Sequence, residues 1–309
     1  MEAYRKGIID SHELAVYSSI EESFPYFLRS CPTVGYPKQL DFRWLKKGKV
    51  KASITFAISE RAEAISLPQS PFGGIFVEIS LSSAELEKFV KAVVEELRRR
   101  QISLVKIVQP PKPYESGFDL INYLLYKNGF AQESVLSHQF FIGKKKIKKL
   151  AKKEQSKFQT KAKEMGAKVQ AGPIQNFGFL QEIRAWNREK GFDANFDDKR
   201  LIAHVSEYPE RYFLISVLKE DKAVAHTLAV QLTPDSFYYF LSAIQPRCAL
   251  KNVGELCLFQ LFQLAAEHNS NFIDLGSSDT DAGANHSLIF FKSRFSNDVC
   301  NKISWSLML

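Results

Sequence analysis

The chain has 309 residues, of which 45% are hydrophobic, and its formal net charge is +8. This length is enough for two domains of about 150 residues, and the apolar content excludes a globally disordered chain. No uninterrupted apolar run approaches the roughly 20 residues of a membrane span, and the first residues lack the apolar region of a secretory signal. We therefore expect a soluble, cytoplasmic protein with no membrane span.

The first half of the chain predicts a set of strands followed by two helix–strand pairs. Residues 39–68 fit three strands that turn at Lys47-Gly48 and at Glu60-Arg61. The later elements of this half are a helix that begins with a capping box of Ser82 and Glu85, a strand over 103–110, a helix through 120–130 and a strand over 134–142.

The second half predicts the same order of elements. It contains three strands over 211–243, a helix over 254–269, a strand over 271–278, an apolar segment over 287–295 and a final strand over 299–309. The repeated order indicates an α/β (α+β) fold with two tandem domains, each a mixed sheet flanked by helices. We expect the domains at 1–143 and 169–309, with the active cleft on the second.

A basic helix is predicted between the two halves. Residues 144–168 contain eleven lysines against two glutamates, which more than accounts for the net charge of the whole chain. The apolar residues of this segment recur at roughly helical spacing. Its lysines form either a solvated face or a polyanion-binding face, and the candidates for the second role are Lys148, Lys149, Lys152 and Lys153.

Three short motifs resemble one family. "FIDLGSS" (272–278) followed by "SLIFFKSRF" (287–295) resembles the Asp-x-Gly and Phe-Lys pattern that ends the second domain of Fem-type proteins. The run 148–169 resembles the basic stretch before that domain, and "SLPQSPFGG" (66–74) resembles a Pro-x-Gly-Gly stretch of the first. Together with the order of elements, these motifs are similar to the GNAT acyltransferase superfamily, in its tandem-GNAT, Fem-type (peptidoglycan aminoacyl-ligase-like) branch.

The resemblance implies a transferase with an activated acyl donor. The reaction would move an acyl or aminoacyl group from acyl-CoA or aminoacyl-tRNA to an amine acceptor, such as a cell-wall precursor. The alternative is a non-catalytic binding or scaffold protein that retains the GNAT fold, because a fold does not fix a function. Cysteine and histidine spacing gives no metal site: none of the four cysteines forms a CxxC pair and the six histidines form no HExxH.

The donor site departs from an ordinary GNAT domain. There, Arg/Gln-x-x-Gly-x-Gly/Ala at the start of the central helix holds the pyrophosphate of CoA on backbone N–H groups. The matching run here is "KNVGEL" (251–256), in which Lys251 and Gly254 are candidate donor-binding residues and Glu255 adds a negative charge. The corresponding run of the first half, 81–86, has no glycine. Acyl-CoA is therefore one candidate donor, and no cofactor is certain.

Lys292 is the leading catalytic candidate. The resemblance implies that its cation stabilises the oxyanion that forms at the transferred carbonyl. The alternative is a solvated lysine that interacts favourably with a helix end. We expect the apolar residues 288–291 to anchor this segment in the core and the head of Lys292 to remain exposed, facing the cleft.

The other candidates lie on neighbouring strands. Asp274, Gly276 and Ser277 end a strand at the kind of position where α/β sheets bind ligands. Tyr239 would protonate the leaving group, with Ser242 beside it as a binding residue, and His226 would be the general base. Each also has an ordinary structural role available, as a turn residue, a core aromatic or a buried histidine.

Overall fold

The computed structural model describes residues 5–9, 12–18, 24–31, 33–191, 196–280 and 283–309, in two compact units. Unit 1 comprises residues 1–137 and 300–309, and unit 2 comprises residues 138–299. The expected division differs from this one at the C-terminal end, because residues 300–309 belong to unit 1. The basic segment belongs to unit 2.

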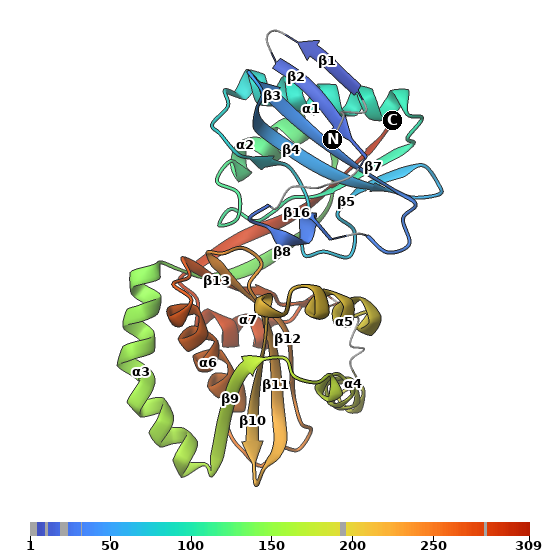
Figure 1. Cartoon of the computed structure of the whole chain (residues 1–309). Coiled ribbons are helices and arrows are strands. Elements are labelled where there is room, and N and C mark those ends of the chain that lie inside the picture. Colours follow the sequence, from blue (N-terminus) through green and yellow to red (C-terminus); the bar gives the residue numbers. More distant parts are fainter. Residues whose placement is uncertain (1–4, 10–11, 19–23, 32, 192–195, 281–282) are drawn as a thin grey trace. The chain divides into compact units, whose positions relative to one another are not determined.

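Unit 1 contains a sheet in the order β1-β2-β3-β4-β5-β7-β16, with β6 paired to β4. Its strands are β1 (Arg5–Ile9), β2 (His12–Tyr17), β3 (Lys38–Lys46), β4 (Lys49–Ile58), β5 (Glu63–Ser66), β6 (Phe76–Val77), β7 (Leu104–Val108) and β16 (Asp298–Met308), which begins in unit 2. Its helices are η1 (Phe27–Arg29), α1 (Ser83–Arg99) and α2 (Phe118–Lys127). Helices α1 and α2 lie against the sheet (Figure 1). Their buried side chains form one core with those of the strands, among them Phe42, Trp44 and Phe56.

Unit 2 contains the order β8-β13-β12-β11-β10-β9. Its strands are β8 (Ala131–Ile142), which begins in unit 1, β9 (Ala167–Pro173), β10 (Tyr212–Lys219), β11 (Lys222–Val230), β12 (Ser236–Ile244), β13 (Phe272–Ser277) and the short pair β14 (Asp279–Thr280) and β15 (Gly283–Ala284). Its helices are α3 (Lys144–Glu164), α4 (Gly178–Glu189), α5 (Asp198–Glu207), η2 (Pro209–Arg211), α6 (Val253–Glu267) and α7 (His286–Ser293). Helix α6 covers the sheet, and α3 packs on α6 (Figure 1).

The two units repeat one topology, as the sequence predicts. In each, three antiparallel strands precede a helix, and the strand after the helix pairs in parallel with the third strand. The parallel pairs are β5 with β7 and β12 with β13. The capping box of Ser82 and Glu85 and the turn at Lys47-Gly48 are confirmed. The α/β class and the tandem arrangement follow directly from this repeat.

The last strand of each half pairs in the other half of the sequence. The end of β8 pairs antiparallel with β13, for example Phe141 with Ile273, both in unit 2. Strand β16 pairs antiparallel with β7, with Trp305 opposite Ile107, in unit 1. Trp305 is buried, and its indole N–H donates to Asn122 Oδ1 of α2 at 2.7 Å. Each half of the sequence therefore supplies one strand to the sheet of the other.

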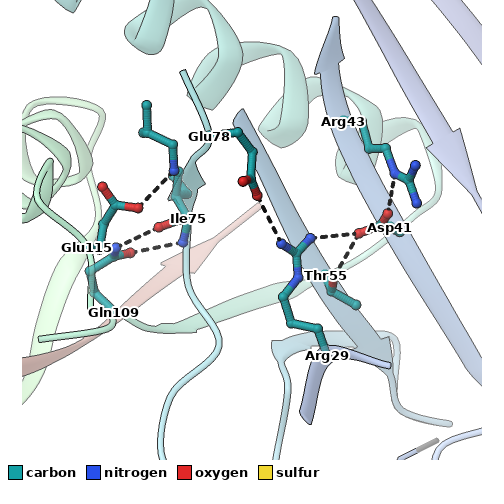
Figure 2. A network of polar contacts seen from close by, with 9 residues as sticks. Arg29, Asp41, Arg43, Thr55, Ile75, Glu78, Gln109 and Glu115 are labelled. Carbon is teal, nitrogen blue, oxygen red and sulfur yellow. Dashed lines mark hydrogen bonds and ion pairs between the residues drawn. The ribbon is translucent and has the colours of Figure 1, made fainter. Parts of the chain in front are cut away.

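Two glycines of the "SLPQSPFGG" motif allow a close approach of backbones in unit 1. A Cβ on Gly73 would lie 2.5 Å from the Cβ of Leu67, and one on Gly74 would lie 2.3 Å from Oε1 of Gln109. Gln109 is fully buried and bonds both backbone groups of Ile75, as Figure 2 shows. The side-chain amide thus replaces a strand partner for this segment.

A buried ionic network stabilises the neighbouring part of unit 1 (Figure 2). Asp41 is 1% exposed and accepts hydrogen bonds from Arg43 at 2.6 Å, Thr55 at 2.8 Å and Arg29 at 3.3 Å. Arg29 also lies 3.6 Å from Glu78. Burial lowers the pKa of the Arg29 guanidinium, while Asp41 and Glu78 oppose that effect. One carboxylate therefore holds two guanidinium groups in the interior.

Candidate active site

The site is built around a bulge at the end of β13. Asp274 pairs with Phe140 of β8, but Ser277 pairs with His138, so that β13 has one more residue than its partner between these pairs. Gly276 lies within the bulge at φ +72°, and its N–H donates to Asp274 Oδ1 at 2.7 Å. A glycine adopts this left-handed conformation without the penalty of a Cβ. Bulges of this kind reorient side chains and are common beside active sites.

Asp274 forms a buried pair with His138, which sequence reasoning did not select. Oδ1 of Asp274 lies 3.2 Å from Nδ1 of His138, and both side chains are 1% exposed. Among the described residues, neither Asp274 Oδ2 nor His138 Nε2 has a hydrogen-bond partner, and the buried hydroxyl of Ser278 has none either. His138 belongs to no motif, and only its position opposite Ser277 in the sheet brings it next to Asp274.

Lys292 reaches the same bulge from α7. This helix begins after Asn285, whose side chain accepts from the Leu288 N–H at 3.0 Å. The ammonium of Lys292 donates to Ser277 O at 2.5 Å and lies 3.5 Å from Gly276 O. It also lies 6.0 Å from the centre of the Tyr239 ring.

The expected burial pattern of α7 is wrong. Phe290 is 71% exposed and Leu288 is 36% exposed, whereas Lys292 is only 4% exposed. Four consecutive apolar residues cannot all face the core from a helix with 3.6 residues per turn. Burial lowers the pKa of Lys292 to about 8, although Asp274 and Asp279 oppose that effect. Burial of this lysine head therefore costs free energy, which its contacts with Ser277 O and Gly276 O partly offset.

Tyr239 and Ser242 form a hydroxyl cluster beside Lys292. Thr227 Oγ1 lies 3.0 Å from Ser242 Oγ. Burial raises the pKa of Tyr239 to about 12, an effect that Cys257 increases and that hydrogen bonds from Ser242 and Thr227 oppose. The phenol is therefore protonated at neutral pH. Tyr238 lies opposite Asp274 on the neighbouring strand, and burial raises its pKa as well.

His226 is placed under α4, among a different set of partners. Its Nδ1 lies 2.9 Å from Ser216 Oγ, and its Nε2 lies 2.6 Å from Glu182 Oε2. The ring of Trp186 stacks on it at 5.3 Å. Burial lowers the pKa of His226, although Glu182 opposes that effect. The structure thus brings Asp274, Gly276, Ser277 and Lys292 together and gives His226 other contacts.

A carboxylate, that of Glu255, lies at the N-terminus of α6. Glu255 accepts from Lys161 of α3 at 2.7 Å and also from Arg294. Partial burial alone would raise the pKa of Glu255, but its hydrogen bonds to Lys161 and Arg294 hold it below its usual value. The ring of Phe291 packs on Gly254, where an added Cβ would lie 3.2 Å away. Lys251, by contrast, is exposed.

The basic segment forms the predicted helix, α3. Ile147, Ala151 and Ala162 are buried, and Lys148, Lys149, Lys152 and Lys153 are exposed. Lys153 lies 3.9 Å from Glu154. Four lysines within two turns of the helix therefore leave a strongly positive, solvent-facing surface.

Neither a metal centre nor a membrane span is found in the part of the chain that the structure describes. Within it, no group of three or more His, Cys, Asp or Glu side chains could hold a metal ion. Likewise, none of its helices is long and apolar enough to cross a membrane.

Comparisons with known proteins identify the fold. No family model matches the sequence, and no curated protein matches it. The structure is similar to the crystal structure of FemX, with a TM-score of 0.62, 12% identity and 87% of each chain covered. It is also similar to a tandem GNAT protein from the clavulanic acid biosynthesis pathway, with a TM-score of 0.52, 8% identity, and 87% of this chain and 82% of the other covered. A conserved protein of unknown function from Bacteroides thetaiotaomicron has a TM-score of 0.51 at 9% identity, over 96% of this chain and 86% of that one. The chain therefore has the tandem GNAT fold that FemX and its structural neighbours share, as the motifs of the sequence predicted.

Proposed function

We propose that the protein transfers an aminoacyl group from an ester-activated donor, an aminoacyl-tRNA, to an amine acceptor, with Lys292 at the reacting carbonyl. The single observation that carries this proposal is the buried ammonium of Lys292 on the β13 bulge. A buried lysine head is costly unless the charge is used or compensated. Its fold supports transferase chemistry in general, because FemX and the tandem GNAT protein share it.

The geometry around Lys292 suits an oxyanion. An ammonium has three N–H donors, and the carbonyl oxygens of Ser277 and Gly276 engage two of them. The third N–H has no partner among the described residues. With a pKa of about 8, the group remains mostly protonated at pH 7 and supplies a full positive charge in a region of low dielectric. Tyr239, protonated at this pH, is the candidate that returns a proton to the leaving oxygen.

The start of α6 favours an aminoacyl-tRNA over an acyl-CoA. A phosphate-binding helix terminus needs exposed N–H groups and no competing anion. Here the Glu255 carboxylate is held in place by Lys161 and Arg294, and Phe291 covers Gly254. A pyrophosphate would have to displace both ion pairs and would meet the charge of Glu255.

The basic face of α3 is the proposed tRNA contact. Each phosphate that a lysine neutralises releases counterions, so the logarithm of the binding constant falls linearly with the logarithm of salt concentration. The face offers Lys148, Lys149, Lys152 and Lys153 without extensive ion pairing. Changing these four residues to alanine should weaken tRNA binding and flatten its salt dependence by roughly three to four units of slope. A variant of four exposed lysines elsewhere, Lys47, Lys49, Lys199 and Lys222, is the control.

Direct transfer is the test of function. The protein is incubated with a pool of tRNA charged with radioactive amino acids and with amine-bearing cell-wall precursors, and acid-stable product is counted. Lys292→Met should reduce transfer by about 10²-fold or more, the scale on which an oxyanion donor acts. Transfer from acyl-CoA instead would contradict the choice of donor. No transfer from either donor would favour the non-catalytic binding or scaffold alternative.

A further inference from the structure

The His138–Asp274 pair has an acid–base feature that neither Lys292 nor Tyr239 supplies. A carboxylate accepts hydrogen bonds, so the nitrogen that faces Asp274, Nδ1, carries the proton of the neutral ring. The other nitrogen, Nε2, then carries a lone pair. That atom is buried, and no described residue donates to it.

The bulge of β13 lies next to both His138 and Lys292. His138 lies opposite Ser277 in the β8–β13 register, and Ser277 O accepts from Lys292. Asp274 acts electrostatically on Lys292 and contacts His138 directly. A buried acceptor with no donor is rare in folded proteins and points to an absent partner group. An N–H of the acceptor amine has the right polarity to be that partner.

We propose that His138, oriented by Asp274, is the general base that takes the proton from the acceptor amine. This inference rests on the proposed function and adds to it a catalytic residue that no motif contains. The amine nitrogen forms a bond to the carbonyl carbon while the carbonyl electron pair moves to oxygen, next to Lys292. A proton moves from the amine to His138 Nε2. The carbon–oxygen bond of the ester then breaks, the carbonyl re-forms, and Tyr239 gives its proton to the leaving alcohol. The proton on His138 then replaces the one that Tyr239 has lost, so both residues return to their starting states.

The charged and titratable groups around the pair come from three elements. Asp274 lies on β13 and contacts the ring directly. Tyr238 lies opposite Asp274 on β12 and is neutral at ordinary pH because burial raises its pKa. Lys292 on α7 supplies a positive charge that interacts electrostatically with Asp274. Asp274 is thus placed between a base and a cation, and it can orient the first while compensating the second.

The first experiment measures the tautomer and needs no substrate. Protein labelled with [15N]histidine is studied by long-range proton–nitrogen NMR, and the His138 signals are assigned from their loss in His138→Gln. We expect the Nδ1–H tautomer in the wild type. In Asp274→Asn the amide N–H group can donate to Nδ1, so a larger share of the Nε2–H tautomer is expected. An Nε2–H tautomer in the wild type would overturn the proposal whatever the activity.

The second experiment measures the proton transfer in the transferase assay. His138→Ala should lose about 10²-fold or more of single-turnover transfer, the usual scale of general-base catalysis. Added imidazole should restore part of that loss to His138→Ala and none to Lys292→Met. The control is His268→Gln, at an exposed histidine of the same unit, which should keep wild-type transfer.

The outcomes separate this inference from the proposed function. Wild-type transfer with an unaffected His138→Ala would overturn the role of His138 and leave the proposed function intact. A loss without imidazole rescue, in a variant that keeps the wild-type thermal transition, would also overturn it, since that pattern belongs to a positioning role. A wild type that transfers nothing refutes the proposed function, and the tautomer measurement then decides the state of His138 independently.

Discussion

Replacing Lys292 by methionine should remove a pH dependence of stability that the buried ammonium imposes on unit 2. The pKa of Lys292 is about 8 in the folded protein, against an ordinary value of 10.5. Between these two pH values the unfolded chain binds a proton that the folded chain does not, so stability rises with pH. The fall in pKa corresponds to a penalty of about 3 kcal/mol in the free energy of unfolding. At pH 7 that penalty is present in full, and at pH 10.5 it has largely disappeared.

The assay compares the wild type with Lys292→Met at each pH. The protein is labelled with 5-fluorotryptophan, and urea unfolding is followed by 19F NMR, in which Trp186 reports unit 2 while Trp44 and Trp305 report unit 1. From pH 7.5 to 10, the wild type should gain about 2 kcal/mol relative to the variant. The methionine variant also lacks the hydrogen bonds to Ser277 O and Gly276 O. This loss changes the difference in unfolding free energy between the two proteins by the same amount at each pH. The control, Lys222→Met at an exposed position, should show no such trend. A constant difference between the wild type and Lys292→Met would refute the reasoning.

Three further changes test the structure. Asp41→Asn should lower the unfolding free energy of unit 1 by about 3 kcal/mol, because it leaves the buried Arg29 with only Glu78 as a compensating charge. Glu78→Gln should lower it less, and urea unfolding followed by the Trp44 signal checks both variants. Deleting residues 304–309 should unfold unit 1, while unit 2 stays folded and Trp186 keeps its native signal. Deleting Leu309 alone should be tolerated. Equal loss of both units would contradict the pairing of β16 with β7. Gly276→Ala should destabilise unit 2 by about 1–2 kcal/mol because of its left-handed φ, whereas Gly172→Ala, with open space around it, should not; an unchanged midpoint for Gly276→Ala would contradict the bulge geometry.

The sequence predicted what local rules control. Turn residues, a capping box and apolar periodicity identified β3 to β5, α1, β10 to β12 and α6, and their repetition predicted the tandem fold. Asp274 and Gly276 were selected because a strand end that opens into a loop shows locally in a sequence, and Lys292 because its Phe-Lys motif resembles that of Fem-type proteins. Their proximity in the fold agrees with that selection, and their roles stay predictions.

The remainder depends on contacts between distant residues. His138 and Asp274 are 136 positions apart, and only the pairing of β8 with β13 brings them together. Likewise, residues 300–309 join unit 1 through the pairing of β16 with β7, and the sequence could not predict this because no local signal shows which sheet edge a terminal strand will join. The prediction that residues 288–291 are all buried was wrong for a different reason. Its composition indicates burial, but its helical conformation turns Phe290 outward.

The exchange of β8 and β16 has a consequence for synthesis of the protein. About 160 residues separate the two segments of unit 1. At roughly 5–20 residues per second, the ribosome needs on the order of 8–30 s to make them. During that time β7 lacks the partner that covers its edge, and an uncovered edge is a template for pairing with other chains. The N-terminal half, although made first, therefore completes its sheet only after residues 300–309 emerge, and the β7 edge stays uncovered through that interval.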